Sequence, residues 1–306
     1  MSNRISLQLK GLLYAIVTAL LWGVLAIALK VSLKDVSPLN IAWFRFALAF
    51  FGLAFYYFWK KPEYLRILRR PPLLLILASL CLGINYLGFI TGIHLTSPGV
   101  AQLFIQTGPV LLAAAGFIFF KEKIIWRQII GFMLVIGGLL LFSREQGCFM
   151  ISDLKTYHTG IGWVLLAAVA WAFYSILVKL LVQRHPPMQL NLVIFGLPAL
   201  FFLPFVKFTG FANLSFIDWI ILIFLGLNTL FAYGTLALAI RYIEASKVSI
   251  IIILNPVLTF ALMGLITLTN ASWIAHEHYT IPGMTGAVVM LSGAVLSILK
   301  PPRYKV

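Results

Sequence analysis

Residues 11–38 read GLLYAIVTALLWGVLAIALKVSLKDVSP, and residues 160–187 read GIGWVLLAAVAWAFYSILVKLLVQRHPP. Both stretches carry a glycine, a tryptophan, a lysine and a proline at spacings of 11, 8 and 8 residues. These markers are Gly11, Trp22, Lys30 and Pro38 in the first stretch, and Gly160, Trp171, Lys179 and Pro187 in the second. Such self-similarity predicts that one structural unit occurs twice in the chain.

Further markers recur along the chain in the same order. Tyr86 is matched by Tyr233, residues 109–110 (Pro-Val) by 256–257, and Gly131 and Gly138 by Gly286 and Gly293. If each copy crosses a membrane an odd number of times, the second copy is inverted relative to the first. Inverted repeats are typical of secondary transporters.

The composition requires a lipid environment. Of the 306 residues, 62% are hydrophobic and only 10% are charged, whereas soluble domains contain about 25% charged residues. The net charge of +15 does not indicate nucleic-acid binding, because the basic residues lie between apolar runs and not on a soluble domain. Two cysteines, Cys81 and Cys148, are too few for a disulfide framework or a metal site.

About 20 apolar residues cross a bilayer as a helix. The sequence predicts an all-α integral membrane protein of ten transmembrane helices, in two inverted five-helix repeats. We expect a first repeat at 1–145, an external linker at 146–160 and a second repeat with a short tail at 161–306. The predicted spans are 11–30, 38–59, 72–94, 98–120, 125–142, 161–182, 187–208, 216–240, 245–269 and 281–299.

Basic residues predict the orientation of these spans. With ten spans, 17 of the 23 lysine and arginine residues fall on the side that holds both termini, and 5 fall on the other side. Loops on the cytoplasmic side of a membrane are enriched in lysine and arginine. We therefore expect a multi-pass protein of the cytoplasmic membrane with both termini in the cytoplasm.

Two prolines occur near the middle of predicted spans four and nine, at Pro109 and Pro256. Each proline removes a helical hydrogen bond to the carbonyl four residues earlier, so each predicts a bend, either lining a cavity or serving only packing. Polar side chains in hydrocarbon need partners, so those near the bends should face the protein interior and bind substrate or tie helices together. They are Asn85, Tyr86, Gln102, Gln106, Asn228, Tyr233, Ser249 and Asn255.

Trp22 and Trp171 lie halfway along spans one and six, whereas tryptophan usually gathers at the membrane surface. They are expected to form aromatic walls of a substrate cavity or to pack the interface between the repeats. Tyr174 is a further candidate for contact with substrate.

Four charged residues have candidate gating or structural roles: Lys30, Arg45, Glu122 and Lys179. Arg45 lies about 10 Å into span two at 1.5 Å per residue. An arginine at that depth either serves function or snorkels to the outer surface, where Asp35 would be its partner. Glu122 either pairs with a basic neighbour to form a gate or anchors the end of span four.

No predicted span has a carboxylate at its middle, where coupled transporters usually carry one. Residues 276–278, His-Glu-His, are expected to form a solvated loop, not a metal site. No catalytic, phosphate-binding or zinc motif occurs in the sequence. We therefore predict no enzyme activity, no cofactor and no metal, with a small molecule and the lipid bilayer as the partners.

The order of these motifs resembles the EamA family of the drug/metabolite transporter superfamily over about residues 8–300. The resemblance rests on Leu21-Trp22-Gly23, on the segment around Arg45, on Pro109-Val110 with Glu122, and on the paired glycines. It implies a ten-helix bundle with a central cavity between helices one, three, four, six, eight and nine. It also implies alternating access and small organic metabolites as cargo.

The second copy departs from the first in three places. Residues 269–272, Thr-Asn-Ala-Ser, replace the segment with Glu122, the loop after them is about eight residues longer by the repeat offsets, and Ile194 replaces Arg45. The two faces are therefore not expected to be gated in the same way. The resemblance implies a metabolite transporter, and the lack of a mid-span carboxylate predicts a facilitator or exchanger. The alternatives are a flippase for lipids or lipid precursors with the same fold, and a membrane-embedded enzyme that modifies lipids.

Overall fold

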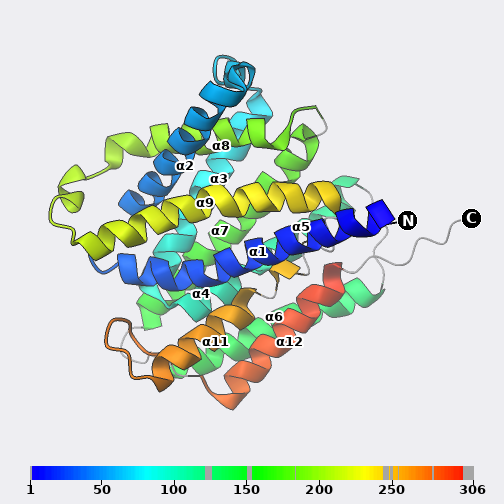
Figure 1. The fold of residues 1–306 in the computed structure, drawn as a ribbon. Helices are drawn as coiled ribbons and strands as arrows, with labels where there is room; N and C mark the ends of the chain where they lie inside the picture. Colours follow the sequence, from blue (N-terminus) through cyan, green and yellow to red (C-terminus); the bar gives the residue numbers. More distant parts are fainter. Residues whose placement is uncertain are drawn as a thin grey trace, which may run out of the picture.

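The computed structural model describes residues 2–120, 126–149, 154–182, 184–243, 248, 251–253, 255–277 and 279–298. These residues form an all-helical bundle with eleven described α-helices and short 3₁₀ turns at Pro62–Leu68, Leu203–Phe205 and Phe208–Phe211 (Figure 1). The α-helices are α1 (Ser2–Ser32), α2 (Pro38–Lys60), α3 (Leu73–Leu95), α4 (Pro98–Phe104), α5 (Thr107–Phe120), α6 (Trp126–Phe149), α7 (Leu154–Leu181), α8 (Pro187–Phe202), α9 (Phe216–Tyr242), α11 (Asn255–Leu268) and α12 (Ile281–Ile298).

Local sequence explains where several helices begin. The Ser37 side chain accepts a hydrogen bond from the Asn40 amide and Pro38 occupies the first turn of α2, where its missing N–H has no cost. Helix α9 begins with a reciprocal capping box between Ser215 and Asp218. Because these caps satisfy backbone amides at the bundle ends, the helices need no partner there.

The outer surface of the bundle is apolar. Large side chains such as Phe55 and Trp126 are 68% and 72% exposed, and contiguous exposed apolar surface of this kind marks contact with lipid or protein. Seven of the described helices are long and apolar enough to cross a membrane. They are α1, α2, α3, α6, α7, α8 and α9, which correspond to predicted spans one, two, three, five, six, seven and eight.

The remaining predicted spans are shorter or divided. Span four is divided into α4 and α5 at residues 105–106, and α12 in span ten has only 18 residues. The described helix of span nine, α11, begins at Asn255. Pro109 follows the break in span four, and the hydrogen bond that it removes accounts for that break. Pro256 lies in the first turn of α11.

Helices α6 and α7 extend beyond their apolar cores. The described helix α6 continues to Phe149 and α7 begins at Leu154, so much of 146–160 is helical. The four residues between these two helices lie outside the described residues. Polar helix ends of this kind can project from the hydrocarbon without cost, because water satisfies their side chains.

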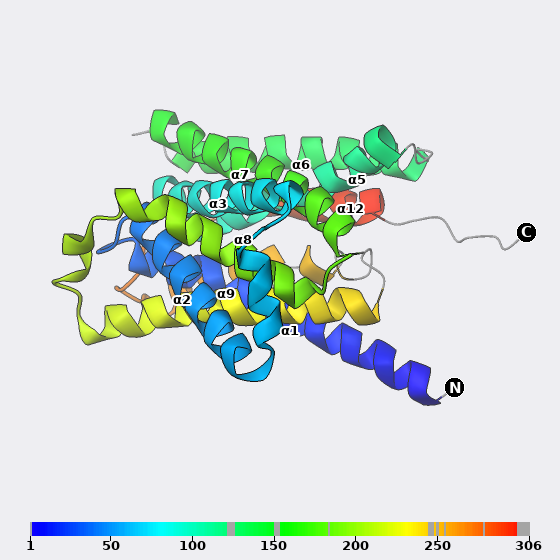
Figure 2. The same ribbon diagram turned by 90° about the horizontal axis from the view of Figure 1, so that it is seen from above.

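The helices of residues 2–149 pack directly against those of residues 154–298. Helix α1 packs along α9, and α3 packs along α7; α2 contacts α9, and α3 contacts α8. Helices α6 and α12 lie side by side at one edge of the bundle, and α2 and α8 lie at the opposite edge (Figure 1). The start of α1 and the end of α12 lie at the same end of the bundle (Figures 1 and 2). We call this end the terminal face and the other end the opposite face.

Four glycines bring α6 and α12 into backbone contact. A methyl group built on Gly131 would lie 2.7 Å from the Gly293 carbonyl oxygen, and one on Gly286 would lie 2.9 Å from the Gly138 oxygen. Small residues permit this close approach in membranes. The glycines that recur in both halves therefore meet each other within one chain, and we call this contact the glycine seam.

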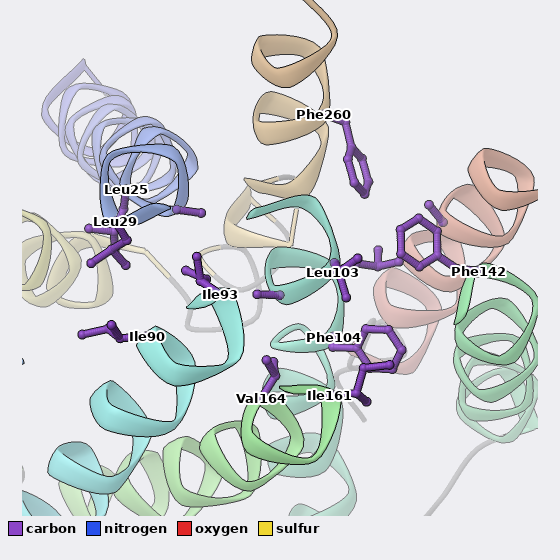
Figure 3. Close-up of a cluster of buried hydrophobic side chains, with 14 of the residues drawn as sticks. Leu25, Leu29, Ile90, Ile93, Leu103, Phe104, Phe142, Ile161, Val164 and Phe260 are labelled. Carbon is purple, nitrogen blue, oxygen red and sulfur yellow. The ribbon is translucent and has the colours of Figure 1, made fainter. Parts of the chain in front are cut away.

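A large apolar cluster fills the bundle towards the opposite face. Figure 3 shows side chains of Leu25 and Leu29 on α1, Ile93 on α3 and Val164 on α7 within this cluster, all of them buried. Leu25 and Leu29 lie along α1 between Trp22 and Lys30. The cluster therefore separates the level of Trp22 from the opposite face.

Replacement of Gly138 by alanine should weaken the glycine seam. The added methyl group would meet backbone atoms of Gly286 and Met290, and overpacking of this kind costs about 1–3 kcal/mol. We expect Gly138→Ala to lower the thermal unfolding midpoint of the purified protein in detergent. Gly137→Ala is the matched control, because a methyl group there meets nothing within 4 Å. Equal midpoints for the two variants would contradict the seam.

Candidate functional site

A cavity of about 90 Å³ lies inside the bundle, and we call it the chamber. A cavity needs about 10–15 Å³ to hold one water molecule. The chamber therefore has room for several waters or a small organic molecule. Both halves of the chain contribute to its lining: Trp22, Leu25, Arg45, Asn85, Tyr86, Phe89, Gln102, Ile105, Gln106, Pro109, Trp171, Tyr233, Ile252 and Asn255.

Aromatic rings form much of the chamber wall. The Trp22 ring contacts the Tyr233 ring edge-on at a centroid distance of 5.5 Å, and the Tyr86 ring lies 6.2 Å from that of Tyr233. Trp171 lines the chamber from α7. Both mid-span tryptophans therefore occupy the cavity wall, and this accounts for their distance from the membrane surface.

Arg45 brings a positive charge into the chamber from α2. Its side chain is only 2% exposed, its Nε donates a hydrogen bond of 3.1 Å to Thr229, and its guanidinium lies 4.4 Å from the centre of the Tyr86 ring. Asp35, proposed as a partner at the outer surface, is exposed. Arg45 therefore does not snorkel, and α2 joins the helices expected to line the cavity.

Polar groups in the chamber differ in how far their hydrogen bonding is satisfied. Asn85 donates to the Ala167 carbonyl at 2.9 Å and so ties α3 to α7. By contrast, Oδ1 of Asn255 is buried without a hydrogen-bond partner among the described residues. The Tyr86 hydroxyl faces Thr229 and Tyr233 but makes no hydrogen bond of normal geometry to a described group. A buried polar atom without a partner is costly, so these atoms are suited to receive a ligand.

Three successive carbonyls of α1 form a hub for side chains from other helices. The carbonyl of Leu21 accepts from Asn228 Nδ2 at 2.7 Å. The Trp22 carbonyl accepts from Gln102 Nε2 at 3.3 Å, and the Gly23 carbonyl accepts from Thr259 Oγ1 at 2.8 Å. Helices α9, α4 and α11 are thus joined to one point of α1.

The two mid-span prolines, Pro109 and Pro256, differ in their local structure. Pro109 lines the chamber, and the carbonyl of Ile105, which it leaves without its usual donor, accepts from the Gly108 amide at 3.0 Å. Pro256 is buried in the first turn of α11, where proline is tolerated. Pro109 therefore lines the chamber just after the interruption between α4 and α5, while Pro256 begins a helix.

Several other candidate residues lie outside the chamber lining. Tyr174 is buried behind it, with its ring 6.3 Å from that of Tyr233, and Asn228 serves as a tie to α1. Lys179 is exposed at the end of α7. Ser249 and Glu122 lie outside the described residues, so their predicted roles have no structural counterpart here.

Lys30 stabilises the opposite face. Its ammonium donates to the carbonyls of Ile93, His94 and Thr96 at 2.9, 3.2 and 2.7 Å, where α3 ends. Cations are favourable at the C-terminus of a helix because the last carbonyls lack partners there. Lys30 thus ties α1 to the end of α3.

A buried acid beside Lys30 was not predicted. Glu277 is 8% exposed, accepts from the Gly99 amide at 2.9 Å and accepts from the Tyr279 hydroxyl. Burial raises the pKa of its carboxyl, although those hydrogen bonds and the charge of Lys30 oppose the rise. The expectation of a solvated loop is thus wrong at Glu277, which is buried against Gly99, 178 residues away in the sequence.

Comparisons with known proteins agree with this architecture. The EamA-like transporter family matches twice, over residues 9–144 and 158–299. A protein of Escherichia coli K12 named "Uncharacterized inner membrane transporter YhbE" is 32% identical, with 94% of this chain and 91% of that protein covered. An "Uncharacterized transporter" of Haemophilus influenzae is 30% identical, with 95% of each chain covered.

The chain belongs to the EamA-like transporter family, a family of membrane transporters and not of enzymes. A solved crystal structure has the same fold, with a TM-score of 0.64 and 17% identity over 95% of this chain and 97% of its own. The family resemblance predicted from the motifs is thereby confirmed.

Replacement of Glu277 by glutamine tests the buried acid, since it keeps the shape and removes the charge. Because burial raises the folded-state pKa above the ordinary 4.5, the wild type should lose stability relative to the variant as pH rises through that pKa. We expect the unfolding midpoint of Glu277→Gln minus that of the wild type to become more positive as the pH rises above about 4.5. A change in the opposite direction would mean that the polar contacts outweigh burial.

Proposed function

We propose that the chain is a secondary transporter with ten membrane-crossing segments in two inverted five-helix repeats, 1–145 and 161–306, joined by an external linker at 146–160. The pairing of helices supports this arrangement. By their order in the repeats, α1 corresponds to α7, α2 to α8, α3 to α9 and α6 to α12. When each helix is exchanged for its counterpart, the α1–α9 contact becomes the α7–α3 contact, and the α2–α9 contact becomes the α8–α3 contact. The α6–α12 and α2–α8 pairs are converted into themselves, as a two-fold axis requires.

Matching glycines support the same relation. A methyl group on Gly11 would lie 2.9 Å from Cβ of Tyr242, and one on Gly160 would lie 2.9 Å from Cβ of Leu95. Each glycine lies near the start of the first helix of its half and contacts the end of the third helix in the other half. The same close packing is thus used in both halves.

The cargo that we propose is a small organic metabolite, of amino-acid-like or related chemistry. The observation that carries this proposal is a chamber of about 90 Å³ between the halves that combines aromatic walls, a buried cation and an unpartnered amide oxygen. Pockets for small molecules usually combine apolar walls with a few directed polar groups. Arg45 and Asn255 would contact the substrate, with Trp22 and Trp171 as walls.

Alternating access would result from rocking of the two halves about the chamber. The apolar cluster around Leu29 and Ile93 closes the side towards the opposite face, so this conformation would open towards the terminal face. No carboxylate in the described part of the chain lines the chamber. We therefore propose facilitated diffusion or exchange without tight coupling to protons.

A comparison of metabolite pools in cells with and without the protein would identify candidate substrates. Purified protein in liposomes would then be tested with the leading compound, with and without a pH gradient. Flux without a gradient supports a facilitator or exchanger. Strict dependence of flux on the gradient would contradict that mechanism, and the absence of any protein-dependent flux would contradict the transporter role.

Asn255→Ala should weaken transport without weakening the fold. If its Oδ1 accepts a hydrogen bond from the substrate, the KM should rise about 2- to 10-fold, since such bonds contribute about 0.5–1.5 kcal/mol. Asn228→Ala is the comparison variant, because Asn228 ties α9 to α1 and its loss should lower the unfolding midpoint instead. Unchanged kinetics in Asn255→Ala would remove Asn255 from the substrate site.

We also propose that the protein resides in the cytoplasmic membrane with both termini in the cytoplasm. Its support is the bias of lysine and arginine described above and the inner-membrane name of the Escherichia coli relative. In a cysteine-free background, Glu63→Cys and Asn213→Cys place thiols at exposed sites on the two faces. We expect an impermeant maleimide added to intact cells to label position 213 and not position 63. Labelling of position 63 and not of position 213 would indicate the opposite orientation and so contradict the proposal.

A further inference from the structure

The chamber contains a positive charge that no described acid balances. Arg45 is almost wholly buried, and its one hydrogen bond to a described group goes from Nε to Thr229. The charged and titratable groups closest to it are the tyrosines Tyr86 and Tyr233. Helices α3 and α9 supply these neighbours, and neither presents a carboxylate to the chamber.

A buried cation without an anion is energetically costly. Arginine within a membrane normally pairs with another side chain or with carbonyls, or it serves an ion or substrate pathway. Thr229 satisfies one of the five N–H donors of a guanidinium. Contact with the Tyr86 ring favours the charge but supplies no acceptor for the remaining donors.

An oxyanion is the ligand that this arrangement lacks. The two parallel N–H groups of a guanidinium match the two oxygens of a carboxylate or phosphate. A phosphate monoester carries a charge of about −1.5 to −2 at neutral pH, and the described lining provides no second cation for it. One cation in a small chamber therefore favours a single carboxylate.

The other polar groups of the chamber suggest what the rest of the ligand carries. Asn255 offers a buried oxygen with no donor among the described residues, so it is suited to accept a hydrogen bond from an N–H or O–H group. The aromatic rings of Trp22, Trp171 and Tyr233 provide apolar surface beside it. A compact molecule with a carboxylate at one end and a donor at the other satisfies both sites.

We infer that the transported substrate is a small monocarboxylate that also bears an amino or hydroxyl group, and that Arg45 binds its carboxylate. This inference rests on the proposed transport function. Tyr86 is a positioning residue, because its ring lies against the guanidinium and orients it. Only the first repeat supplies this anion site, since Ile194 replaces Arg45 in the second and is buried in an apolar cluster.

The test uses liposomes that contain the full-length protein and are loaded with a metabolite extract. Compounds released faster than from protein-free liposomes are identified by mass spectrometry, so no substrate is assumed in advance. We expect the released compounds to carry one carboxylate. The primary amides of these compounds should be released no faster than from protein-free liposomes. Release only of compounds that lack a carboxylate would overturn the inference but leave the transporter role standing. Absence of protein-dependent release would overturn both.

Variants of Arg45 assign the anion site. We expect Arg45→Gln to reduce the initial release rate of the carboxylates about 10- to 100-fold, the range for a charge-assisted contact. Arg45→Lys keeps the positive charge but lacks the two parallel N–H groups of the guanidinium. Its release rate should therefore lie between those of Arg45→Gln and the wild type, with a KM above that of the wild type. Unchanged release by Arg45→Gln would overturn the assignment. If that variant does not fold, the KM of Arg45→Lys decides, and a wild-type KM would count against the carboxylate contact.

Competing anions separate the two oxyanion classes. We expect acetate to slow release of the carboxylate substrate by the wild type and to have little effect on the residual rate of Arg45→Lys. Inorganic phosphate at about pH 8, where it is mainly a dianion, should not compete. Competition by phosphate without competition by acetate would replace the carboxylate with a phosphate group and so overturn the proposal.

Discussion

In hydrocarbon, polar groups of the chain must find their partners within the protein. This constraint acts most strongly at the middle of α1, where the carbonyls of Leu21, Trp22 and Gly23 accept hydrogen bonds from three other helices. The donors are satisfied only when these helices meet α1 at that depth. The same contacts place Trp22 at the chamber wall, so the requirement that assembles the bundle also positions part of its candidate site.

The sequence predicts much of the fold because the duplicated markers occupy positions where few other residues fit. Glycines of the seam allow backbone contact, and Pro109 leaves a helix turn without its usual donor. Most of the chamber was likewise predicted from polar and aromatic residues at mid-span. What could not be predicted are contacts between residues far apart in the chain: Arg45 with Thr229, and Glu277 with Gly99. Neither partner has a spacing that marks it in one sequence.

The two halves share residues that pack the helices but differ in the polar groups that they place in the chamber. The glycine seam and the two tryptophans are common to both halves. Among the described residues that line the chamber, the buried cation comes from the first half, and the amide oxygen of Asn255, which has no described partner, comes from the second. Glu277 lies in a loop that is longer than its counterpart in the first half. If the halves are related by the proposed two-fold axis, the chamber is less symmetric than the helices around it, and the two ends of a bound ligand would be distinguished.

The position of Trp22 and Trp171 in the chamber wall has an optical consequence. Indole emission depends on the polarity and hydration around the ring, and these two rings face the space that a ligand would enter. The chain has eight tryptophans, so the change would be superimposed on a background from the others. The protein thus contains its own spectroscopic reporter, and filling of the chamber can be followed without a label attached to the molecule.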